Sequence, residues 1–240
     1  MRTAVRAVAR SVPMAEPEPH RPQRRDAAAN RERLLAAAAN AVKRDGERVP
    51  MSVIAARAGV GIGTLYRHYP SRSKLLAALA ERSYRLVLDH ARVAAASREP
   101  ATTAIARFLE QTIAARDDLI LPLHGGPVET DARTVALRTE ISDLLDQVLA
   151  RGRTDGTIRA DVTAVDLIIT GAILAQPLAH ANDWDTLARR QAGIYLAGLA
   201  DTGSGPLPGR SPTRSQLEAG FAHAASRRRD RTRPGSSGSR

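Results

Sequence analysis

The sequence predicts an all-α protein, and three observations lead to this fold class. Alanine, leucine and arginine dominate the composition, and aromatic residues make up only 3 % of the 240 residues. A sheet protein would need more β-branched and aromatic side chains. Apolar residues recur at helical spacing between breaks marked by glycine or proline. Residues 53–76 have the pattern of two short helices separated by a glycine turn.

The first three predicted helices form an N-terminal headpiece over residues 27–76. An alanine-rich helix is expected from Asp26 to Arg44, because its apolar residues form one stripe. Asp45-Gly46 then gives a C-terminal stop signal. The second helix breaks at Gly59, where a positive φ is expected, and the third runs from about Ile62 to His68. The sequence therefore predicts a three-helix unit with a helix-turn-helix at its end.

The headpiece also has a predictable core. The second and third helices are expected to turn one apolar set inward, onto the apolar stripe of the first helix. The inward-facing set is Ile54, Ala55, Ala58, Val60 and Leu65, and the stripe beneath it contains Leu34, Leu35 and Ala38. Tyr69 is expected to pack in the same core.

The helices after the headpiece are predicted from apolar stripes and breaks. Ser71 is expected to cap a long helix that runs toward Ser97. Four more helices are expected, at about 101–116, 132–152, 162–181 and 184–200. An irregular stretch around Pro122 and Pro127 separates the first two of these four.

This pattern divides the chain into four segments. Residues 1–26 are predicted to be a disordered basic arm, because they are rich in proline and arginine. Residues 27–76 are the headpiece, and residues 77–201 form a second helical domain. Residues 202–240 are predicted to be a disordered basic tail of Gly, Pro, Ser and Arg, with one brief amphipathic stretch at 216–225.

The net charge of +11 is unevenly distributed along the chain. Residues 1–26 contribute +3 and residues 202–240 contribute +6. Residues 27–76 have nine basic and three acidic side chains, whereas residues 77–201 have thirteen basic and seventeen acidic ones. The positive charge of the folded part therefore lies on the headpiece, as binding to phosphates requires.

Composition excludes several other classes of protein. The chain has no cysteine, which excludes disulfides, cysteine-type zinc sites and thiol catalysis. Its longest mostly apolar run, Leu167 to Ala175, is far shorter than the ~20 residues that span a bilayer. We therefore expect a cytoplasmic protein with no membrane partner.

The third headpiece helix carries the side chains that we expect to touch DNA. In a helix-turn-helix, the second helix of the motif enters the major groove. Arg67 suits a two-bond contact to guanine, Thr64 can bond a base or a phosphate, and Gly63 allows a close approach of the backbone. Three further residues, Tyr66, His68 and Arg72, suit phosphates. The expected DNA-binding set is Ile62, Gly63, Thr64, Tyr66, Arg67, His68 and Arg72.

The block IAARAGVGIGTLYRHYPSR, from Ile54 to Arg72, closely resembles the headpiece of tetracycline-repressor (TetR) family regulators. The family usually has phenylalanine where Tyr69 stands and lysine where Arg72 stands, and both replacements keep the chemistry. The resemblance implies that the helix 62–68 is the recognition helix and that Arg72 is a phosphate clamp opening the fourth helix. It also implies a C-terminal bundle that binds a small-molecule effector.

The resemblance further implies a cavity among the helices of residues 77–181. Tyr84, Arg107, Phe108, Thr112 and His124 are candidate lining residues, because each breaks or caps an apolar stripe. For each of them an ordinary place in the core or in a loop stays open as the alternative.

The last two predicted helices, about 162–181 and 184–200, are apolar around much of their circumference. One bundle face can absorb part of this surface, and the excess suggests a subunit interface. Two such helices from each chain would make a four-helix contact with twofold symmetry. Fully buried core helices remain the alternative.

The function expected from these observations is a ligand-responsive transcriptional regulator, most often a repressor, that binds a pseudo-palindromic double-stranded DNA operator as a homodimer. The alternative is an architectural protein that binds nucleic acid without sequence preference through its basic tails. Deleting residues 202–240 would abolish binding by such a protein, whereas a regulator would retain its operator.

The sequence gives little support to an enzymatic function. Thr64 stands where a dinucleotide loop beginning at Gly59 needs its last glycine, and no strand precedes the loop. The six histidines lack metal-ligand spacing, and we expect neither a metal nor a cofactor. Asp117-Asp118 is expected to be a solvated helix end whose two carboxylates point apart. The sequence therefore predicts no catalytic residue.

Overall fold

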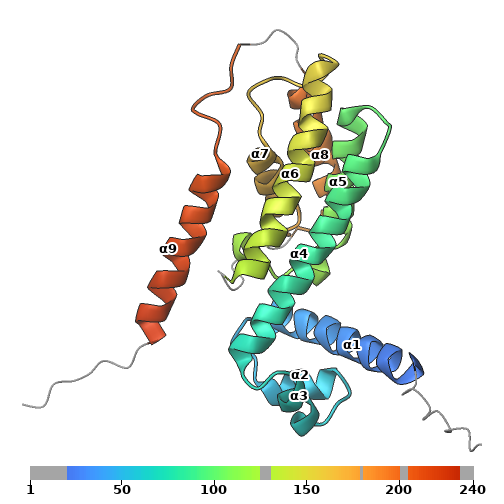
Figure 1. The fold of residues 1–240 in the computed structure, drawn as a ribbon, viewed down its shortest axis with the longest axis vertical. Helices are drawn as coiled ribbons and strands as arrows, with labels where there is room; N and C mark the ends of the chain where they lie inside the picture. The colour runs from blue at the N-terminus through green and yellow to red at the C-terminus, as the bar shows by residue number, and fades with distance from the viewer. Residues whose placement is uncertain (1–20, 125–130, 179–180, 201–204, 233–240) are drawn as a thin grey trace, which may run out of the picture.

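The computed structural model describes residues 21–124, 131–178, 181–200 and 205–232, and these residues form helices and no strand (Figure 1). The predicted all-α class is thus confirmed. The described α-helices are α1 (Arg21–Asp45), α2 (Met51–Arg57), α3 (Ile62–His68), α4 (Arg72–Ala96), α5 (Ala101–Ala114), α6 (Ala132–Thr154), α7 (Ala164–Leu174), α8 (Trp184–Leu199) and α9 (Arg214–Thr232). Two short 3₁₀ helices, η1 (Arg116–Asp118) and η2 (Pro122–His124), lie between α5 and α6.

Helices α1, α2 and α3 form the headpiece at one end of the molecule (Figure 1). Gly59 makes the turn between α2 and α3 with a φ of +66°, a conformation that glycine adopts without steric cost. The predicted inward-facing set is confirmed. Its members Ile54, Ala55 and Leu65 are buried in one cluster with the α1 stripe, and Ala58 and Val60 pack against that cluster partly buried.

Helix α4 belongs to two hydrophobic cores. Ser71 caps its start, as predicted, by accepting a hydrogen bond from the backbone N–H of Lys74. Leu75 and Leu79, on its first turns, are buried in the headpiece core. From Ala80 onward, its buried residues belong to the core of the helical bundle. The headpiece and the bundle are therefore joined by one uninterrupted helix.

The bundle surrounds the rest of α4. Helix α6 lies along α4, and α5 packs against both α4 and α8 (Figure 1). Phe108, Leu109, Leu145 and Leu167 are fully buried at the centre. Burying side chains of this size stabilises a fold by roughly 1.5–3 kcal/mol each before the loss of chain entropy. These contacts make the bundle a packed unit with its own core.

Two helix ends differ from the prediction for local reasons. Helix α1 begins at Arg21 and not near Asp26, because a proline at position 22 lies in the first turn, where its missing N–H needs no partner. Helix α7 ends at Leu174 and not near 181, and Pro177 follows three residues later. The predicted helices were therefore right in kind and misplaced at their ends.

The C-terminal tail departs most from the prediction. Residues 205–232 were expected to be disordered, but they form an extended segment followed by the long helix α9. The carboxylate of Asp161 accepts a hydrogen bond from the backbone N–H of Leu207 at 2.7 Å, and Arg159 donates to the carbonyl of Gly205 at 2.9 Å. The prediction of a disordered tail is wrong over this segment, because these contacts are distant in sequence.

Asp161 is the centre of this attachment. Arg159 donates to both carboxylate oxygens, at 2.5 and 3.0 Å. The hydrogen bonds from Arg159 and from the N–H of Leu207 lower the pKa of Asp161 to about 2. Ser211 also donates to the backbone carbonyl of Asp161 at 2.6 Å. The predicted arm over residues 1–20, and residues 202–204 and 233–240 of the predicted tail, lie outside the described residues.

None of the helices in the described ranges combines the length and the apolar character needed to cross a bilayer.

Substituting Gly152 tests how tightly α6 packs on its neighbours. A Cβ at this position would lie 2.5 Å from Cδ1 of Ile158 and 2.9 Å from Cβ of Ala101. We expect Gly152→Ala to lower the free energy of unfolding by about 1–3 kcal/mol, measured by urea denaturation, since overpacking forces the neighbours to move. Gly63→Ala is the control, because a Cβ there meets nothing within 4 Å. Equal stability of the two variants would contradict this packing.

Candidate DNA-binding face and effector pocket

Helix α3 presents a solvent-exposed face at the far end of the headpiece. Ile62 and Tyr66 remain 43 % and 47 % exposed, although both are large and apolar enough to be buried. Arg67 and His68 are exposed beside them, whereas Leu65 points inward and is fully buried. The outward and inward residues of α3 thus divide as the sequence predicted, and α3 is free to enter a groove.

Arg67 is oriented before any ligand is present. Its Nη2 donates a hydrogen bond to Oγ1 of Thr64, one turn earlier in α3, at 2.9 Å. Gly63 lies on the same face, and a Cβ there would meet nothing in the protein. The open space around Gly63 is consistent with a close approach of a DNA backbone. These three residues therefore form one surface, as expected for a reading face.

Arg72 has partners within the headpiece, and its expected contact with a DNA phosphate stays a prediction. Its Nη1 donates to the carbonyl oxygens of Glu47 and Val49, at 2.7 and 2.5 Å, in the segment between α1 and α2. Arg72 therefore holds that segment against the start of α4. The side chain expected to clamp a phosphate is therefore already hydrogen-bonded within the headpiece.

Tyr69 confirms its expected place in the core. The residue is buried, and the guanidinium of Arg31 lies 5.9 Å from the centre of its ring. Burial raises the pKa of the Tyr69 hydroxyl. The ring is thus part of the scaffold beneath α3, and Tyr66 is the tyrosine that faces outward.

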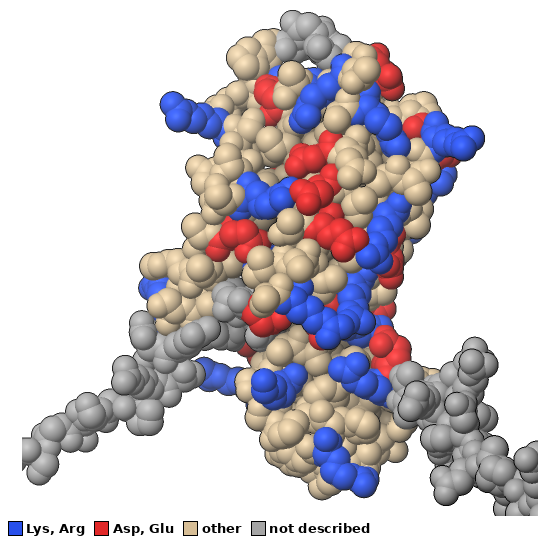
Figure 2. Space-filling view, viewed as in Figure 1, with Lys and Arg blue, Asp and Glu red and all other residues tan. Residues whose placement is uncertain are grey.

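Charge on the visible surface follows the division seen in the sequence. On the face shown in Figure 2, the headpiece carries a few basic side chains among mostly uncharged ones, with acidic side chains only near its junction with the bundle, whereas both signs mix over the bundle. Such a local excess of positive charge attracts a phosphate backbone. The surface therefore favours nucleic acid at the headpiece end of the molecule.

The bundle contains a small, mostly apolar cavity of about 60 Å³ between α4, α5, α6, α7 and α9. Three of the five predicted pocket residues, Tyr84, Phe108 and Thr112, line it. Burial raises the pKa of the Tyr84 hydroxyl to about 12. The Thr112 hydroxyl donates to the carbonyl of Phe108 at 2.8 Å. Three of the predicted pocket residues therefore surround one cavity, and their contact with an effector stays a prediction.

Of the other two predicted pocket residues, Arg107 does not line the cavity, and His124 has no described side chain. Arg107 lies on the outer side of α5 and donates to Glu99 at 2.9 Å, because it stands one position before the inward-facing Phe108. His124 ends η2, and its side chain lies outside the described part of the chain. Arg107 was selected as a break in an apolar stripe, but that break lies on the solvent side.

The polar pair at the cavity, Arg138 and Glu218, was not predicted from the sequence. Arg138 of α6 is only 7 % exposed, and its Nε and Nη2 donate to the two carboxylate oxygens of Glu218 in α9 at 2.7 and 2.6 Å. One signal was present, because Arg138 lies three residues before Ile141 on an apolar stripe of α6. Glu218 had no such signal, since its helix was not predicted.

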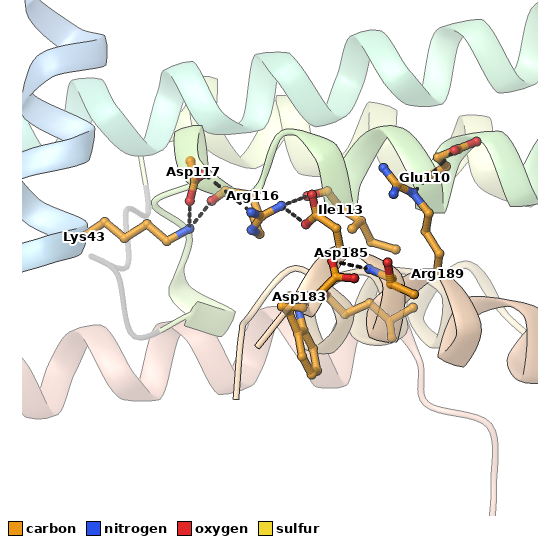
Figure 3. Close-up of polar contacts among 11 residues, drawn as sticks. Lys43, Glu110, Ile113, Arg116, Asp117, Asp183, Asp185 and Arg189 are labelled. Carbon is orange, nitrogen blue, oxygen red and sulfur yellow. Dashed lines mark hydrogen bonds and ion pairs between the residues drawn. The ribbon is translucent and has the colours of Figure 1, made fainter. Parts of the chain in front are cut away.

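A chain of polar contacts joins the headpiece to the bundle (Figure 3). Nζ of Lys43 in α1 donates to the carboxylate of Asp117 at 2.9 Å and to the carbonyl of Arg116 at 2.7 Å. Arg116 in turn donates to Asp185 at the start of α8. The hydrogen bond from Lys43 lowers the pKa of Asp117. A movement of α8 or η1 would therefore be transmitted to α1 through these hydrogen bonds.

A second set of contacts acts at the same junction. Arg82 of α4 pairs with Asp118 of η1 at 3.0 Å and with Glu32 of α1. The carboxylates of Asp117 and Asp118 point to different partners, which confirms that they point apart. Their side chains remain 64 % and 42 % exposed, as expected of a solvated helix end, and each also pairs with a basic side chain of another helix.

Helices α7 and α8 leave an apolar surface exposed. Ile173 and Ile194 are 64 % and 58 % exposed, and Leu178 and Leu187 are exposed nearby in sequence. On α8, a Cβ added at Gly193 or at Gly198 would meet no atom of the described residues within 4 Å. The alternative that both helices are fully buried within their own bundle is therefore wrong.

Two family models match successive parts of the chain. The model described as bacterial regulatory proteins, tetR family, matches residues 34–79, which include α2, α3 and the start of α4. The model described as transcriptional regulator SbtR-like, C-terminal domain, matches residues 100–201. The two matches cover the headpiece and the bundle separately, in the order expected from the fold.

Individual relatives agree with these models. The solved TetR transcription regulatory protein from Mycobacterium vanbaalenii is 31 % identical, with a TM-score of 0.54, over 75 % of this chain and 99 % of that one. The transcriptional repressor KstR of Rhodococcus jostii is 29 % identical over 170 residues, or 70 % of this chain and 77 % of the relative. The corresponding KstR of Mycobacterium tuberculosis is 27 % identical over 199 residues, or 80 % of this chain and 89 % of the relative.

A more distant structure shares the fold. The chain is 16 % identical to AibR, solved in complex with isovaleryl coenzyme A and operator DNA, with a TM-score of 0.55. The likeness covers 69 % of this chain and 97 % of AibR. The arrangement of headpiece and bundle is therefore one that also occurs in a protein captured with both DNA and a small molecule.

Replacing Arg67 tests the reading face. We expect Arg67→Ala to weaken binding to a DNA fragment selected by the wild-type chain by about 1–3 kcal/mol, since a two-bond contact to a base is lost. Binding to a random duplex of the same length is expected to fall much less. Fluorescence anisotropy at fixed salt measures both. Arg98→Ala, an equal charge change at an exposed site beyond α4, is the control; equal losses of Arg67→Ala on both duplexes would remove Arg67 from the reading face.

Proposed function

The chain belongs to the tetR family of bacterial regulatory proteins, and we propose that it represses transcription by binding a pseudo-palindromic operator as a homodimer and releasing it when a small molecule binds the bundle. The observation that carries the proposal is the exposed face of α3, where Arg67 is bonded to Thr64 beside Tyr66. The KstR relatives, which are repressors, support the sign of regulation.

The DNA-binding residues follow from that face. We assign Ile62, Gly63, Thr64 and Arg67 to the major groove, and Tyr66 and His68 to flanking phosphates. Arg72 acts on DNA chiefly by fixing the start of α4, since its Nη1 is bonded to two carbonyls of the headpiece. A buried inward side and an exposed polar outward side of α3 support this division.

Dimerisation through α7 and α8 places two recognition helices on one DNA duplex. The exposed isoleucines and leucines of these helices support a hydrophobic interface, and the bare sides of Gly193 and Gly198 allow close approach of a second helix. Twofold symmetry then sets the recognition helices about one turn of DNA apart, ~34–36 Å, or somewhat more. A pseudo-palindromic operator is the DNA counterpart of this symmetry.

Effector control requires that the small molecule prefer one arrangement of the headpieces over another. The cavity among α4–α7 is the site we propose for it, with Tyr84, Phe108 and Thr112 in its wall. The contacts of Lys43 and Arg82 with η1 offer a route from the bundle to the headpiece. A change of the cavity wall would tilt α1 and α3 together.

The competing functions have less support. The family consists of transcription regulators, and we assign this chain no catalytic step. An architectural role is not favoured, because such proteins bind without sequence preference, whereas this chain has a structured reading helix. The cytoplasm, where the bacterial chromosome lies, is the compartment in which this function would be exercised.

Selection of bound fragments from total genomic DNA tests the proposed function. We expect the purified wild-type chain to enrich a small set of fragments that share a pseudo-palindromic sequence, and to retain them after deletion of residues 202–240. Enrichment is measured by sequencing against input DNA at moderate salt. A chain that enriches nothing over random DNA is not a regulator of this kind.

A charge placed on the exposed face of α8 tests the dimer. We expect Ile194→Glu to shift the chain from dimer to monomer in light scattering, and to weaken operator binding at least tenfold, because each half-site must then be bound alone. Val93→Glu is the matched control, since Val93 is 45 % exposed on α4, away from α7 and α8. A dimeric Ile194→Glu variant would place the interface elsewhere.

A further inference from the structure

Helix α9 covers the effector cavity. Leu217, Glu218 and Phe221 of α9 line it, opposite the walls contributed by α4, α5, α6 and α7. Figure 1 shows α9 standing beside α6 and α7, on the side of the bundle away from α5. The helix is thus a cover added to a complete bundle and not one of its structural members.

The size of the covered cavity decides what it can hold. The space of about 60 Å³ accommodates a few water molecules, whereas pockets for drug-sized ligands measure about 300–1,000 Å³. The ring of Phe221, which is only 8 % exposed, occupies space that would otherwise belong to the cavity. An effector larger than a few atoms can therefore enter only after side chains of α9 leave.

The buried guanidinium of Arg138 favours a negative charge on any molecule that displaces Glu218. Its guanidinium makes a two-bond fork with Glu218 and lies 5.6 Å from the ring centre of Tyr84 and 5.1 Å from that of Phe221. Removing one partner of a buried ion pair is costly because the remaining charge is left uncompensated. A molecule that displaces Glu218 and brings its own anionic group would replace both the charge and the hydrogen bonds that Glu218 supplies to Arg138.

The wall offers a second polar group to such a molecule. The Tyr84 hydroxyl is buried and faces the guanidinium of Arg138, which partly offsets the rise in its pKa that burial causes. A carboxylate bound to Arg138 would be close to this hydroxyl. The rest of the wall is mostly apolar, with Phe108, Ile141 and Ile168 on three different helices, and it also contains Thr112, Ser142 and Arg214.

The attachment of α9 is light enough to be reversed. Besides the fork to Arg138, the ion pairs among the described side chains of α9 are those of Arg214 with Asp143 and Asp146, at 2.5 and 3.5 Å, and these carboxylates are about half exposed. Exposed pairs contribute about 0–1 kcal/mol each. Among the α9 residues whose burial is described, Phe221 and Ala225 are the buried ones.

We propose that α9 is a tethered competitor of the effector, with Glu218 occupying the place of a ligand carboxylate and Phe221 that of its apolar body. The effector class that follows is an amphipathic carboxylate, whose binding releases α9 from the bundle. This inference rests on the proposed function, since it names the ligand chemistry of the same cavity. The competition sets the effector concentration at which the chain responds.

The test uses decanoate as the probe, with decan-1-ol as its uncharged match, on the full-length chain. Titration calorimetry is expected to give a dissociation constant for decanoate about tenfold lower for Glu218→Gln than for wild type, which corresponds to a cover closed ~90 % of the time. Arg138→Gln is expected to lose decanoate binding, and decan-1-ol to bind more weakly than decanoate to every variant that retains Arg138. Glu110→Gln, at an exposed carboxylate of α5, is the matched control and is expected to behave as wild type.

Hydrogen exchange supplies the second measurement, independent of affinity. Amides of residues 214–225 are expected to exchange faster in Glu218→Gln, and in wild type saturated with decanoate, while those of α4 and α6 stay protected. Decanoate that binds wild type and Glu218→Gln equally, or that leaves α9 protected when bound, overturns the competition. Absence of decanoate binding to Glu218→Gln overturns the ligand class. Genomic fragment selection is carried out without decanoate, so a failure of the proposed function would be seen separately.

Discussion

The fold depends on the fact that α4 is shared by two hydrophobic cores. Leu79 is buried in the headpiece core, and its neighbour Ala80 is buried in the bundle core. A helix of 25 residues is about 37 Å long, so α4 acts as a single strut through most of the molecule. Neither unit can rotate about a flexible linker at this point. Any change in the bundle that moves α4 must therefore move the helix-turn-helix as well.

At the junction around α4, buried apolar side chains provide stability, and polar contacts fix how the elements are oriented. Ile120 is buried in the headpiece core, while the preceding Leu119 is buried in the bundle core. Ser83 of α4 accepts a hydrogen bond from the N–H of Ile120 at 2.8 Å and so fixes this crossing. The surrounding ion pairs of Lys43 and Arg82 are at least partly exposed and add little stability each, but they define the angle between α1 and η1.

Local signals in the sequence predicted the scaffold, and contacts between distant residues escaped them. The turn at Gly59, the limits of α3 and the burial of Leu65 follow from spacing within a few residues, and all agree with the structure. The role of Arg72 depends on carbonyls more than twenty residues earlier, and the fork of Arg138 depends on a helix eighty residues later. No pattern along the chain distinguishes a charge that finds such a partner from one that points to solvent. The same ambiguity led to Arg107, which breaks an apolar stripe as Arg138 does but faces outward.

The continuity of α4 has a consequence for how such a chain can change during evolution. Each residue of an α-helix advances it by 1.5 Å and turns it by about 100°. An insertion or deletion of one residue between Leu79 and Tyr84 would therefore swing the headpiece by roughly a quarter of a turn about the helix axis relative to the bundle. In a symmetric dimer the two recognition helices would swing in opposite senses, and neither would remain in phase with the groove. Side chains on the surface of α4 are free to vary. The number of residues in α4 between the two cores is fixed, because the two recognition helices must stay in phase with the grooves of DNA.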